Sequence, residues 1–239
     1  MPEADEPVGR SHLYGRRKGR PLRAHQQGLM ADLLPQVMLD PAALGDNPLA
    51  LFPPGLKHLR LEVGFGGGEH LAHEARQNPA TGFIGCEPFA NGVARLLVDI
   101  AAGSIANIRI YPDDACAVMA ALPDACLAGV DILFPDPWPK RRQKQRRFIS
   151  DQRLVELARL LPQGANLRFA TDIDDYAAWT LSRIARSPHF LWCTIKADEW
   201  RQAWPGWPGT RYEAKASAAG RPAVWLKFER NGVPAPSIA

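Results

Sequence analysis

The sequence predicts an α/β fold, with a seven-stranded, mostly parallel sheet that has one antiparallel strand and helices on both faces. Three observations lead to this fold class. From Leu59 onward, short apolar runs alternate with longer segments whose apolar residues recur at helical spacing. Each of the first five runs is followed by such a helical segment, as the crossovers of a parallel sheet require. The last two runs instead flank a loop from Lys196 to Pro222, so we expect the seventh strand to lie antiparallel to the sixth.

The predicted strands are short apolar runs bounded by Gly, Pro or polar residues. In chain order they are Leu59–Val63, Gly82–Cys86, Asn107–Tyr111, Val130–Phe134, Ala165–Ala170, Phe190–Ile195 and Ala223–Phe228. The predicted helices, which carry apolar residues three or four positions apart, are Glu69–Gln77, Gly92–Ala102, Ala115–Leu122, Phe148–Leu161 and Asp174–Arg186. We expect a single domain over residues 25–239, with a helical extension from Leu29 to Pro54 packed on the sheet.

The basic residues gather in two segments that contain no acidic residue. Six of the 29 lysines and arginines lie between Arg10 and Arg23, and six more lie between Lys140 and Arg147. The rest of the chain is acidic overall, although the formal net charge of the whole chain is +4. A solvated surface would explain one such segment, but two of them favour a polyanionic partner such as nucleic acid. Residues 1–24, which contain the first segment, are predicted to form a flexible basic arm.

Composition excludes several classes of protein. The longest stretch without a charged side chain is ten residues, half of what a membrane-spanning helix needs. The first residues are acidic and lack an apolar segment, so we expect no secretory signal and a cytoplasmic location. Cys86, Cys116, Cys126 and Cys193 stand singly, with no neighbouring cysteine or histidine at ligand spacing. We therefore expect neither a metal site nor a disulfide.

A glycine-rich turn follows the first predicted strand, with the pattern Glu62-x-Gly64-x-Gly66-x-Gly68. The dinucleotide-binding motif needs a glycine at the place of Glu69, and a phosphate-binding loop needs Gly-Lys-Ser/Thr, so neither motif fits. An acidic residue ahead of the glycines is compatible with a cationic ligand that carries an amino group and a sulfonium. A tight turn without a ligand is the alternative explanation.

Acidic residues also follow the second and third predicted strands. Glu87 lies about 20 residues past the turn, where a carboxylate can accept hydrogen bonds from both hydroxyls of a ribose. Asp113 and Asp114 can reach an adenine edge, although one of them could instead cap the next helix. The order of an acidic glycine turn, a Glu and an Asp on three successive strand ends predicts S-adenosylmethionine as the cofactor.

The fourth predicted strand runs into a proline-rich loop that ends in the second basic segment. Ligands of open α/β sheets bind at the carboxyl ends of the strands where the strand order reverses, and the fourth strand lies beside the first in that arrangement. Asp136, fixed between two prolines, would border the methyl donor there. Trp138 offers a flat face on which a base can stack. The alternative is a proline-rich turn with a buried tryptophan and a capping aspartate.

Two further segments carry polar residues that could meet a base. Asp172 follows the fifth predicted strand, although it could cap the next helix. In the late loop, Thr210 and Glu213 could hydrogen-bond a base edge. The basic residues expected to grip RNA phosphates are Arg16, Arg17, Lys18, Arg20, Arg141, Arg142, Lys144, Arg146 and Arg147.

Together these motifs resemble the bacterial tRNA (guanine-N7-)-methyltransferase family over nearly the whole chain from Gly15. The matching pieces are Tyr14–Arg20, LEVGFGGGEHL from Leu61, GFIGCE ending at Glu87, Asp114-Ala115, FPDPWPKRRQKQRR from Phe134 to Arg147, Ala170–Asp172 and Thr210–Glu213. The resemblance implies a Rossmann-like class I methyltransferase fold, S-adenosylmethionine as cofactor and tRNA as partner. The implied target is N7 of a variable-loop guanine, position 46 of the tRNA.

The resemblance also implies roles for individual residues. It assigns cofactor binding to Glu62, Gly64, Gly66, Gly68, Glu87, Asp114 and Asp136, and tRNA contacts to Lys140, Asp172, Thr210, Arg211, Tyr212 and Glu213. We expect no metal and no membrane association, and a monomer or a weak homodimer.

The chemistry of guanine N7 agrees with this interpretation. N7 already has an in-plane lone pair, so no general base is needed. The enzyme must hold N7 in line with the sulfonium methyl, an orientation effect worth about 7–11 kcal/mol. Positive charge then develops on the purine, and Asp136 is the candidate catalytic residue because its carboxylate would stabilise that charge, while Asp172 or Glu213 could accept from guanine N1 and N2. A methyltransferase for another RNA base or a protein side chain, and an RNA-binding module without catalysis, stay open as alternatives.

Overall fold

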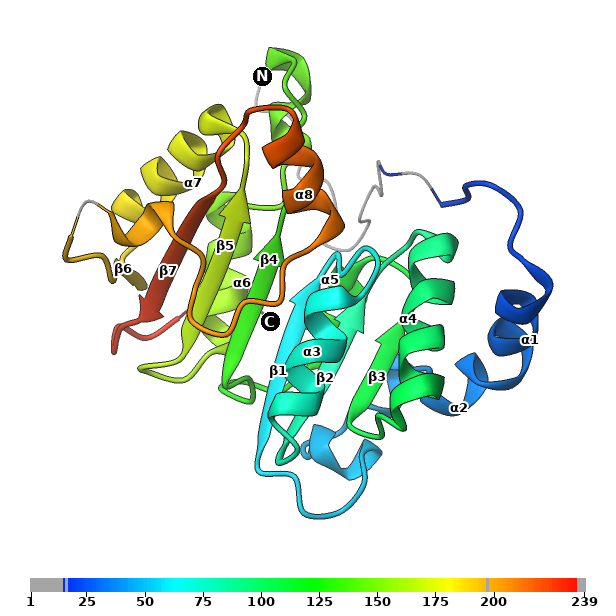
Figure 1. Ribbon diagram of the computed structural model, residues 1–239. Coiled ribbons are helices and arrows are strands. Elements are labelled where there is room, and N and C mark those ends of the chain that lie inside the picture. The colour runs from blue at the N-terminus through cyan, green and yellow to red at the C-terminus, as the bar shows by residue number, and fades with distance from the viewer. Residues whose placement is uncertain (1–14, 16, 197, 236–239) are drawn as a thin grey trace, which may run out of the picture.

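The computed structural model describes residue 15 and residues 17–196 and 198–235. Within these residues, seven strands form a sheet in the order β3-β2-β1-β4-β5-β7-β6 (Figure 1). They are β1 (His58–Val63), β2 (Thr81–Cys86), β3 (Ile108–Tyr111), β4 (Gly129–Leu133), β5 (Asn166–Thr171), β6 (Phe190–Trp192) and β7 (Val224–Arg230). β1 to β5 pair in parallel, and β7 runs antiparallel to both β5 and β6. The predicted fold class is therefore confirmed.

Most strand ends lie close to the predicted bounds. β2 is buried along its whole length between β1 and β3, which is why its sequence is a continuous apolar run. β6 is the exception, because it ends at Trp192 rather than at Ile195. It is an edge strand that pairs only with β7, and Leu191 and Trp192 are exposed. Phe190 is buried in the core, but the apolar side chains after it reflect neither burial nor a longer strand.

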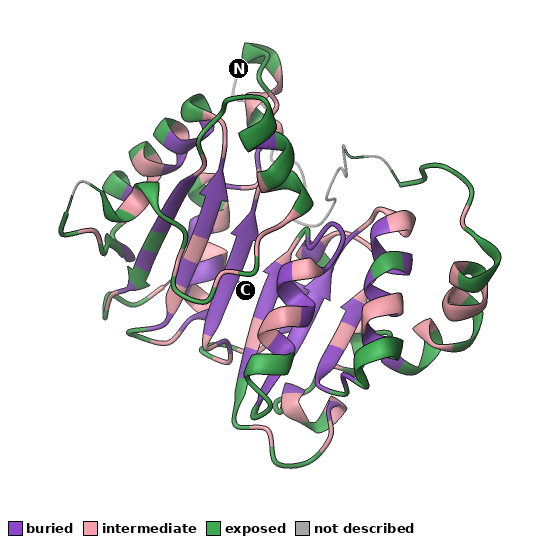
Figure 2. Cartoon of the chain, in the orientation of Figure 1, coloured by how far each residue is buried: buried purple, intermediate pink, exposed green. Residues whose placement is uncertain are grey.

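Helices cover both faces of the sheet. Those between the strands are α3 (Glu69–Gln77), α4 (Ala90–Gly103), α5 (Ala115–Ala121), α6 (Asp151–Leu160) and α7 (Asp174–Arg186). α3 and α4 form one apolar core with Phe83, whereas α5, α6 and α7 form another with the next residue, Ile84. Successive strand residues point to opposite faces, so these two helix layers lie on opposite sides. Figure 2 shows the strands largely buried between them.

The beginning of α6 shows how a local hydrogen bond sets a helix boundary. The Ser150 hydroxyl accepts a hydrogen bond from the Arg153 N–H at 3.1 Å, which makes Ser150 the N-cap. Phe148 and Ile149 therefore precede the helix, although the sequence analysis placed the helix start at Phe148. Their apolar side chains pack beneath α6 and extend the apolar pattern beyond the helix itself.

The segment before β1 carries short helices. They are α1 (Ala24–Asp32), α2 (Leu34–Val37), η1 (Pro41–Ala43) and η2 (Pro48–Leu51), of which the last two are 3₁₀ helices. Leu29 and Val37 pack on the core that α3 and α4 share, and α1 lies against α4 (Figure 1). None of the described helices is long and apolar enough to cross a membrane.

The segment from Lys196 to Pro222, expected to be a loop, contains the 3₁₀ helix η4 (Glu199–Arg201) and helix α8 (Arg211–Ala218). The expectation of a loop is therefore wrong for these residues. Thr210 caps α8, since its hydroxyl accepts from the Glu213 N–H at 3.2 Å. Thr-x-x-Glu is a recognised helix-start pattern, so the signal for this helix was present in the sequence.

Candidate active site

A cavity of about 570 Å³ opens at the carboxyl ends of four neighbouring strands. Its walls include Val63 at the end of β1 with Gly64 after it, Glu87–Phe89 after β2, Asp113–Ala115 after β3, and Phe134–Asp136 after β4. β1 and β4 are neighbours, and the strand order reverses between them. The cavity therefore lies at the topological switch point, where open α/β sheets bind ligands, and its volume suits a ligand of drug-like size.

The glycine turn is held between two helices. Gly64 and Gly66 have φ of 71° and 57°, a left-handed conformation that favours glycine. A Cβ on Gly92 would lie 2.1 Å from the Gly66 carbonyl oxygen, so α4 begins in direct contact with the turn. The Tyr212 ring of α8 approaches the turn as well, because a Cβ on Gly66 would lie 2.7 Å from it. Gly64 lines the cavity, whereas Gly66 and Gly68 shape the turn that leads into α3.

Glu87 ties the glycine turn to the end of β2. Its Oε2 accepts from the Gly66 N–H at 2.7 Å, and its Oε1 accepts from the Phe89 N–H at 2.9 Å. Burial raises the pKa of this carboxyl, and the two backbone donors partly oppose that shift. The carboxylate lines the cavity with acceptor capacity left on each oxygen, which suits the expected contact with a ribose.

Glu62 lies in a different environment from the one that we expected. Its carboxylate is buried and contacts His70 Nδ1 of α3 at 2.7 Å, and it does not line the cavity. Burial alone would lower the pKa of His70, but the Glu62 carboxylate raises it. The reason is strand alternation, which turns Glu62 toward α3 while its neighbour Val63 faces the cavity. The acidic residue ahead of the glycines thus contacts the helix that follows the turn, and not the cavity.

The two aspartates after β3 have separate partners. Asp114 caps α5, because its carboxylate accepts from the Cys116 N–H at 2.8 Å, yet it also lines the cavity. Asp113 pairs with Arg17 of the basic arm at 2.9 Å. Of the other arm residues expected to bind phosphates, Lys18 and Arg20 are exposed and Arg16 lies outside the described residues.

The loop after β4 is strained on both sides of Asp136. Phe134 and Trp138 have φ of 50° and 41°, values that side chains with a Cβ rarely adopt. Such strain persists where the surroundings enforce it, and it concentrates at functional sites. Asp136 lines the cavity, and partial desolvation there raises the pKa of its carboxyl. Among the described residues, no cation lies within ion-pair distance of Asp136.

Trp138 lines the cavity together with Arg146. The Arg146 guanidinium lies 5.1 Å from the centre of the Trp138 ring, a cation–π distance. A base that stacks on this face of Trp138 would have to displace Arg146.

The second basic segment forms the 3₁₀ helix η3 (Arg141–Arg146). Its exposed members that were expected to contact RNA are Lys140, Arg141 and Arg142. Lys144 lies 2.6 Å from Asp175 of α7. η3 adjoins the cavity, since Trp138 before it and Arg146 at its end both line the cavity wall.

The expected contact of Arg147 with an RNA phosphate is wrong. Its side chain is fully buried, its Nε donates to the Pro137 carbonyl at 2.8 Å, and it pairs with Asp175 at 2.5 Å. The guanidinium also lies over the rings of Tyr176 and Trp179. A buried group with these partners cannot reach an RNA phosphate, so Arg147 instead braces the loop of Asp136.

The residues expected to contact the base are engaged with other parts of the chain. Asp172 does not cap α7 but accepts from Arg221 Nε at 2.7 Å. Glu213 accepts from Trp207 Nε1 at 2.5 Å, and the Trp207 ring lies 5.0 Å from that of His70. Through Trp207 and His70, the segment that begins α8 is packed against the helix that follows the glycine turn. Arg211 and Tyr212 lie on the same first turn of α8.

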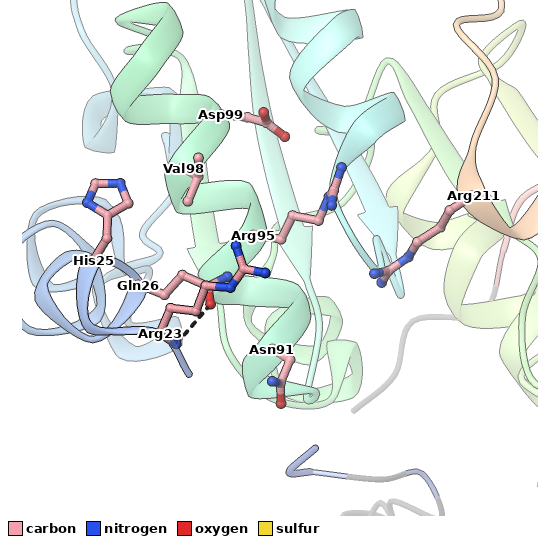
Figure 3. Close-up of a pocket in the computed structure, with 8 residues that line it drawn as sticks. All are labelled: Arg23, His25, Gln26, Asn91, Arg95, Val98, Asp99 and Arg211. Atoms are coloured by element: carbon pink, nitrogen blue, oxygen red, sulfur yellow. Dashed lines mark hydrogen bonds between the residues drawn. The ribbon is translucent and has the colours of Figure 1, made fainter. Parts of the chain in front are cut away.

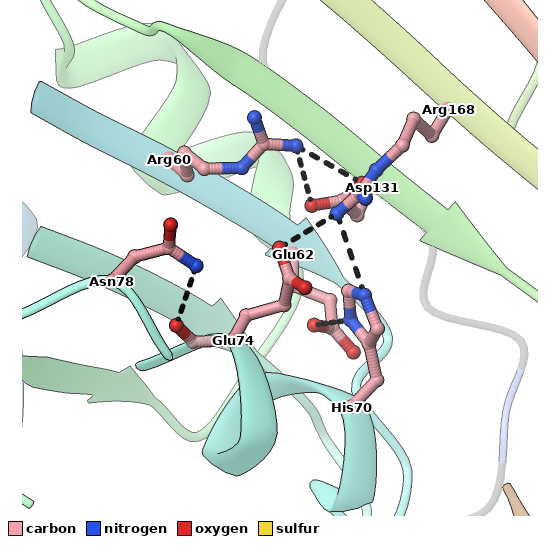
Figure 4. A network of polar contacts seen from close by, with 7 residues as sticks. All are labelled: Arg60, Glu62, His70, Glu74, Asn78, Asp131 and Arg168. Carbon is pink, nitrogen blue, oxygen red and sulfur yellow. Dashed lines mark hydrogen bonds and ion pairs between the residues drawn. The ribbon is translucent and has the colours of Figure 1, made fainter. Parts of the chain in front are cut away.

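A buried ionic network, which the sequence analysis missed, lies on the α3 face of the sheet (Figure 4). Asp131 of β4 accepts from Arg60 at 3.0 Å and from Arg168, and Arg168 also contacts Glu74 at 3.2 Å. Although burial alone would raise it, these guanidiniums hold the pKa of the Asp131 carboxyl well below its usual range. A charged residue inside an apolar strand was the available signal, because a buried charge requires a partner. No cluster of metal-ligating side chains occurs among the residues that the structure describes.

Comparison with known proteins decides the family. A family model with the description "Putative methyltransferase" matches residues 57–226. The tRNA (guanine-N(7)-)-methyltransferase of Nitrobacter hamburgensis is 51% identical over 223 residues, which cover 93% of this chain and 88% of that protein. The chain belongs to the tRNA (guanine-N7-)-methyltransferase family. A member from Brucella anthropi is 48% identical over 232 residues, 96% of this chain and 100% of its own length.

Solved structures support the fold of this family member. A 16S rRNA methyltransferase, KamB, superimposes with a TM-score of 0.55 at 16% identity and covers 79% of this chain and 94% of its own. An antibiotic-related methyltransferase gives a TM-score of 0.53 at 16% identity, with 83% and 98% covered. At this identity the likeness concerns the fold alone, and it agrees with the methyltransferase sheet described above.

Proposed function

We propose that this chain transfers a methyl group from S-adenosylmethionine to N7 of a guanine in the variable loop of tRNA, at position 46. The observation that carries the proposal is the juxtaposition of an acidic cavity with exposed cations at its rim. Four carboxylates, those of Glu87, Asp113, Asp114 and Asp136, line the cavity, whereas Arg146 is the basic residue in its wall. Lys140, Arg141 and Arg142 stand at the surface next to it.

The residues of the cavity fit S-adenosylmethionine. An excess of carboxylates favours a cationic ligand and disfavours the phosphates of a dinucleotide. Glu87 would accept from the ribose hydroxyls, and Asp114 lies where the adenine edge is expected. When bound, the cofactor supplies an electrophilic methyl group. Glu62 would act indirectly, by holding the glycine turn through His70.

Asp136 is the residue that we assign to the reacting base. The two strained residues of its loop and the Arg147 contact with Pro137 fix its carboxylate at the cavity wall. A preorganised carboxylate that pairs with no cation in the described part of the chain can stabilise the positive charge that develops on the purine. Since N7 carries a lone pair in the plane of the ring, the site needs no general base, and positioning dominates the rate.

The cations at the rim would hold the RNA backbone. Phosphate contacts fix the position of a nucleic acid and carry little sequence information, so Lys140, Arg141 and Arg142 supply affinity rather than choice of base. Thr210 to Glu213 and Asp172 would contact the guanine after their present partners rearrange. We also propose that the protein acts in the cytoplasm, where tRNA is located, as a monomer or weak homodimer.

Methyl transfer to unmodified tRNA tests the proposal. The purified protein is incubated with total tRNA from cells that lack 7-methylguanosine and with methyl-labelled S-adenosylmethionine, and the digested nucleosides are separated. We expect the label in 7-methylguanosine. Label in another nucleoside would overturn the assignment of N7, and cofactor binding without label in any nucleoside would overturn the RNA substrate.

A further inference from the structure

A second hollow, also of about 570 Å³, lies beside α4 outside the cofactor cavity (Figure 3). Arginines from three elements line it, and these elements are far apart in the sequence. Arg23 precedes α1, Arg95 stands on α4, and Arg211 begins α8. Arg23 and Arg211 extend toward α4 from opposite sides (Figure 3). The fold thus gathers these guanidiniums in one groove.

The acidic residues near the groove neutralise its cations only in part. The Glu69 carboxylate is shared between Arg95, whose Nε lies 3.4 Å away, and Arg211, whose Nε lies 3.9 Å away. Both arginine side chains stay open to solvent, with 54% and 41% of their surface exposed. Among the described residues, no carboxylate lies within ion-pair distance of Arg23. Asp99 adds one negative charge to the groove wall, so the groove keeps a net positive charge.

Arginine geometry leaves these groups able to bind an anion. A guanidinium has five N–H donors, and both contacts with Glu69 use Nε, which directs the Nη groups elsewhere. Among the described residues that line the groove, three are arginines, and the imidazole of His25 is the one aromatic ring. Three guanidiniums suit phosphate groups, so the chemistry of the groove favours the backbone of a nucleic acid.

The groove adjoins the cofactor cavity. Asn91 and Arg211 line the groove, whereas Phe89 and Tyr212, near them in sequence, line the cavity. Asn91 also holds the basic arm, because its Oδ1 accepts from the Gly19 N–H at 2.9 Å and its Nδ2 donates to the Arg20 carbonyl at 2.7 Å. An RNA strand that crosses the cavity mouth would meet η3 after β4 and the groove beside α4.

We propose that this groove is a second phosphate-binding site, which holds the RNA backbone on the α4 side of the target base. The inference rests on the proposed function, since it assumes that RNA enters the cavity. The proposal assigns phosphate binding to Arg23 and Arg95. This role is additional to the phosphate contacts expected of η3 and of the arm residues Arg16 to Arg20. Arg211 then links the groove with the cavity through its neighbour Tyr212.

The double variant Arg23→Ala/Arg95→Ala tests the proposal in the full chain. Both side chains are exposed, so the fold should tolerate their removal. We expect the affinity for unmodified tRNA to fall at least fivefold at low salt, with the affinity for S-adenosylmethionine unchanged. The logarithm of tRNA affinity falls linearly with the logarithm of salt concentration. The magnitude of this negative slope should decrease by about 0.7–0.9 for each phosphate that the variant no longer binds.

The control is Arg186→Ala at the last turn of α7, which removes one exposed positive charge at the opposite edge of the sheet. We expect this variant to keep the tRNA affinity and the salt slope of the wild type. If the double variant behaves like Arg186→Ala, the groove binds no phosphate and the proposal is wrong, even if the wild type methylates guanine N7. If the double variant loses tRNA affinity while the label appears in another nucleoside, phosphate binding by the groove is supported and the proposed target is wrong.

Discussion

Two groups of carboxylates on the same sheet have opposite electrostatic surroundings. In the network on the α3 face, Asp131 lies between Arg60 and Arg168, which hold the pKa of its carboxyl low against the effect of burial. In the cavity, burial raises the pKa of Glu87 and of Asp136, and no cation among the described residues pairs with either. The comparison teaches that cations of the fold compensate the first group, whereas Glu87 and Asp136 keep the acceptor capacity that the proposed function assigns to a ligand.

Removal of Asp131 should give the largest effect on stability. The variant Asp131→Ala leaves Arg60 and Arg168 without their buried partner, so we expect the free energy of unfolding to fall by about 3–5 kcal/mol. Urea denaturation followed by circular dichroism at neutral pH measures it. Asp198→Ala, which breaks the exposed pair with Arg201, is the control and should change little. Equal losses in both variants would contradict the structural role of the network.

The variant Asp136→Asn should instead affect the rate. We expect the single-turnover rate of methyl transfer to fall about 10²–10³-fold, since the proposed role of this charge is to stabilise the purine in the transition state. The free energy of unfolding should stay the same or rise, because the variant removes a partly desolvated carboxylate that has no cationic partner among the described residues. A folded variant that binds the cofactor and reacts at the wild-type rate would remove Asp136 from the mechanism.

The variant Glu87→Gln should weaken the cofactor site. A hydrogen bond to a charged group is worth about 1.5–3 kcal/mol, so we expect the affinity for S-adenosylmethionine to fall roughly 10–100-fold. Titration calorimetry measures it without RNA. Glu156→Gln on α6, an acidic residue outside the cavity wall, is the control. An unchanged cofactor affinity in Glu87→Gln would place the ribose elsewhere.

The pH dependence of the rate should separate the two groups further. Because the pKa of Asp136 is raised, its carboxylate is protonated at a higher pH than an ordinary aspartate, whose pKa is 3.8. We expect the single-turnover rate to fall about tenfold for each pH unit below that raised pKa, and Asp136→Asn to lose this dependence. The pKa of Asp131 is shifted in the opposite direction, below its ordinary value. Its stabilising contribution is present above about pH 4 and is lost only as the pH falls through its lowered pKa.

Much of this site could be predicted from the sequence because strand ends converge. Apolar runs fix the strands to within one or two residues for all but β6, and parallel strands bring their carboxyl ends to one edge. Glu87 directly follows β2, and Asp136 comes shortly after β4, so both line the cavity at that edge, as expected. Their positions depend on the backbone alone, which local sequence patterns describe well.

The rest could not be predicted because it depends on partners from distant segments. Glu62 was expected to bind the cofactor, yet its side chain contacts His70. The direction of this side chain follows from strand alternation and from the position of α3. Arg147 stands in a basic segment but is buried against Asp175, which comes from another helix. In both cases the residue type was consistent with the expected role, and only three-dimensional packing shows the other partner.

Guanine N7 is the atom that the proposed site holds against Asp136. The most direct test is methyl transfer to a tRNA in which the guanine at position 46 is replaced by 7-deazaguanine, which has a carbon in place of N7. We predict that this tRNA binds as tightly as the unmodified one and receives no methyl group. Methylation of the 7-deazaguanine tRNA at the normal rate would contradict this assignment.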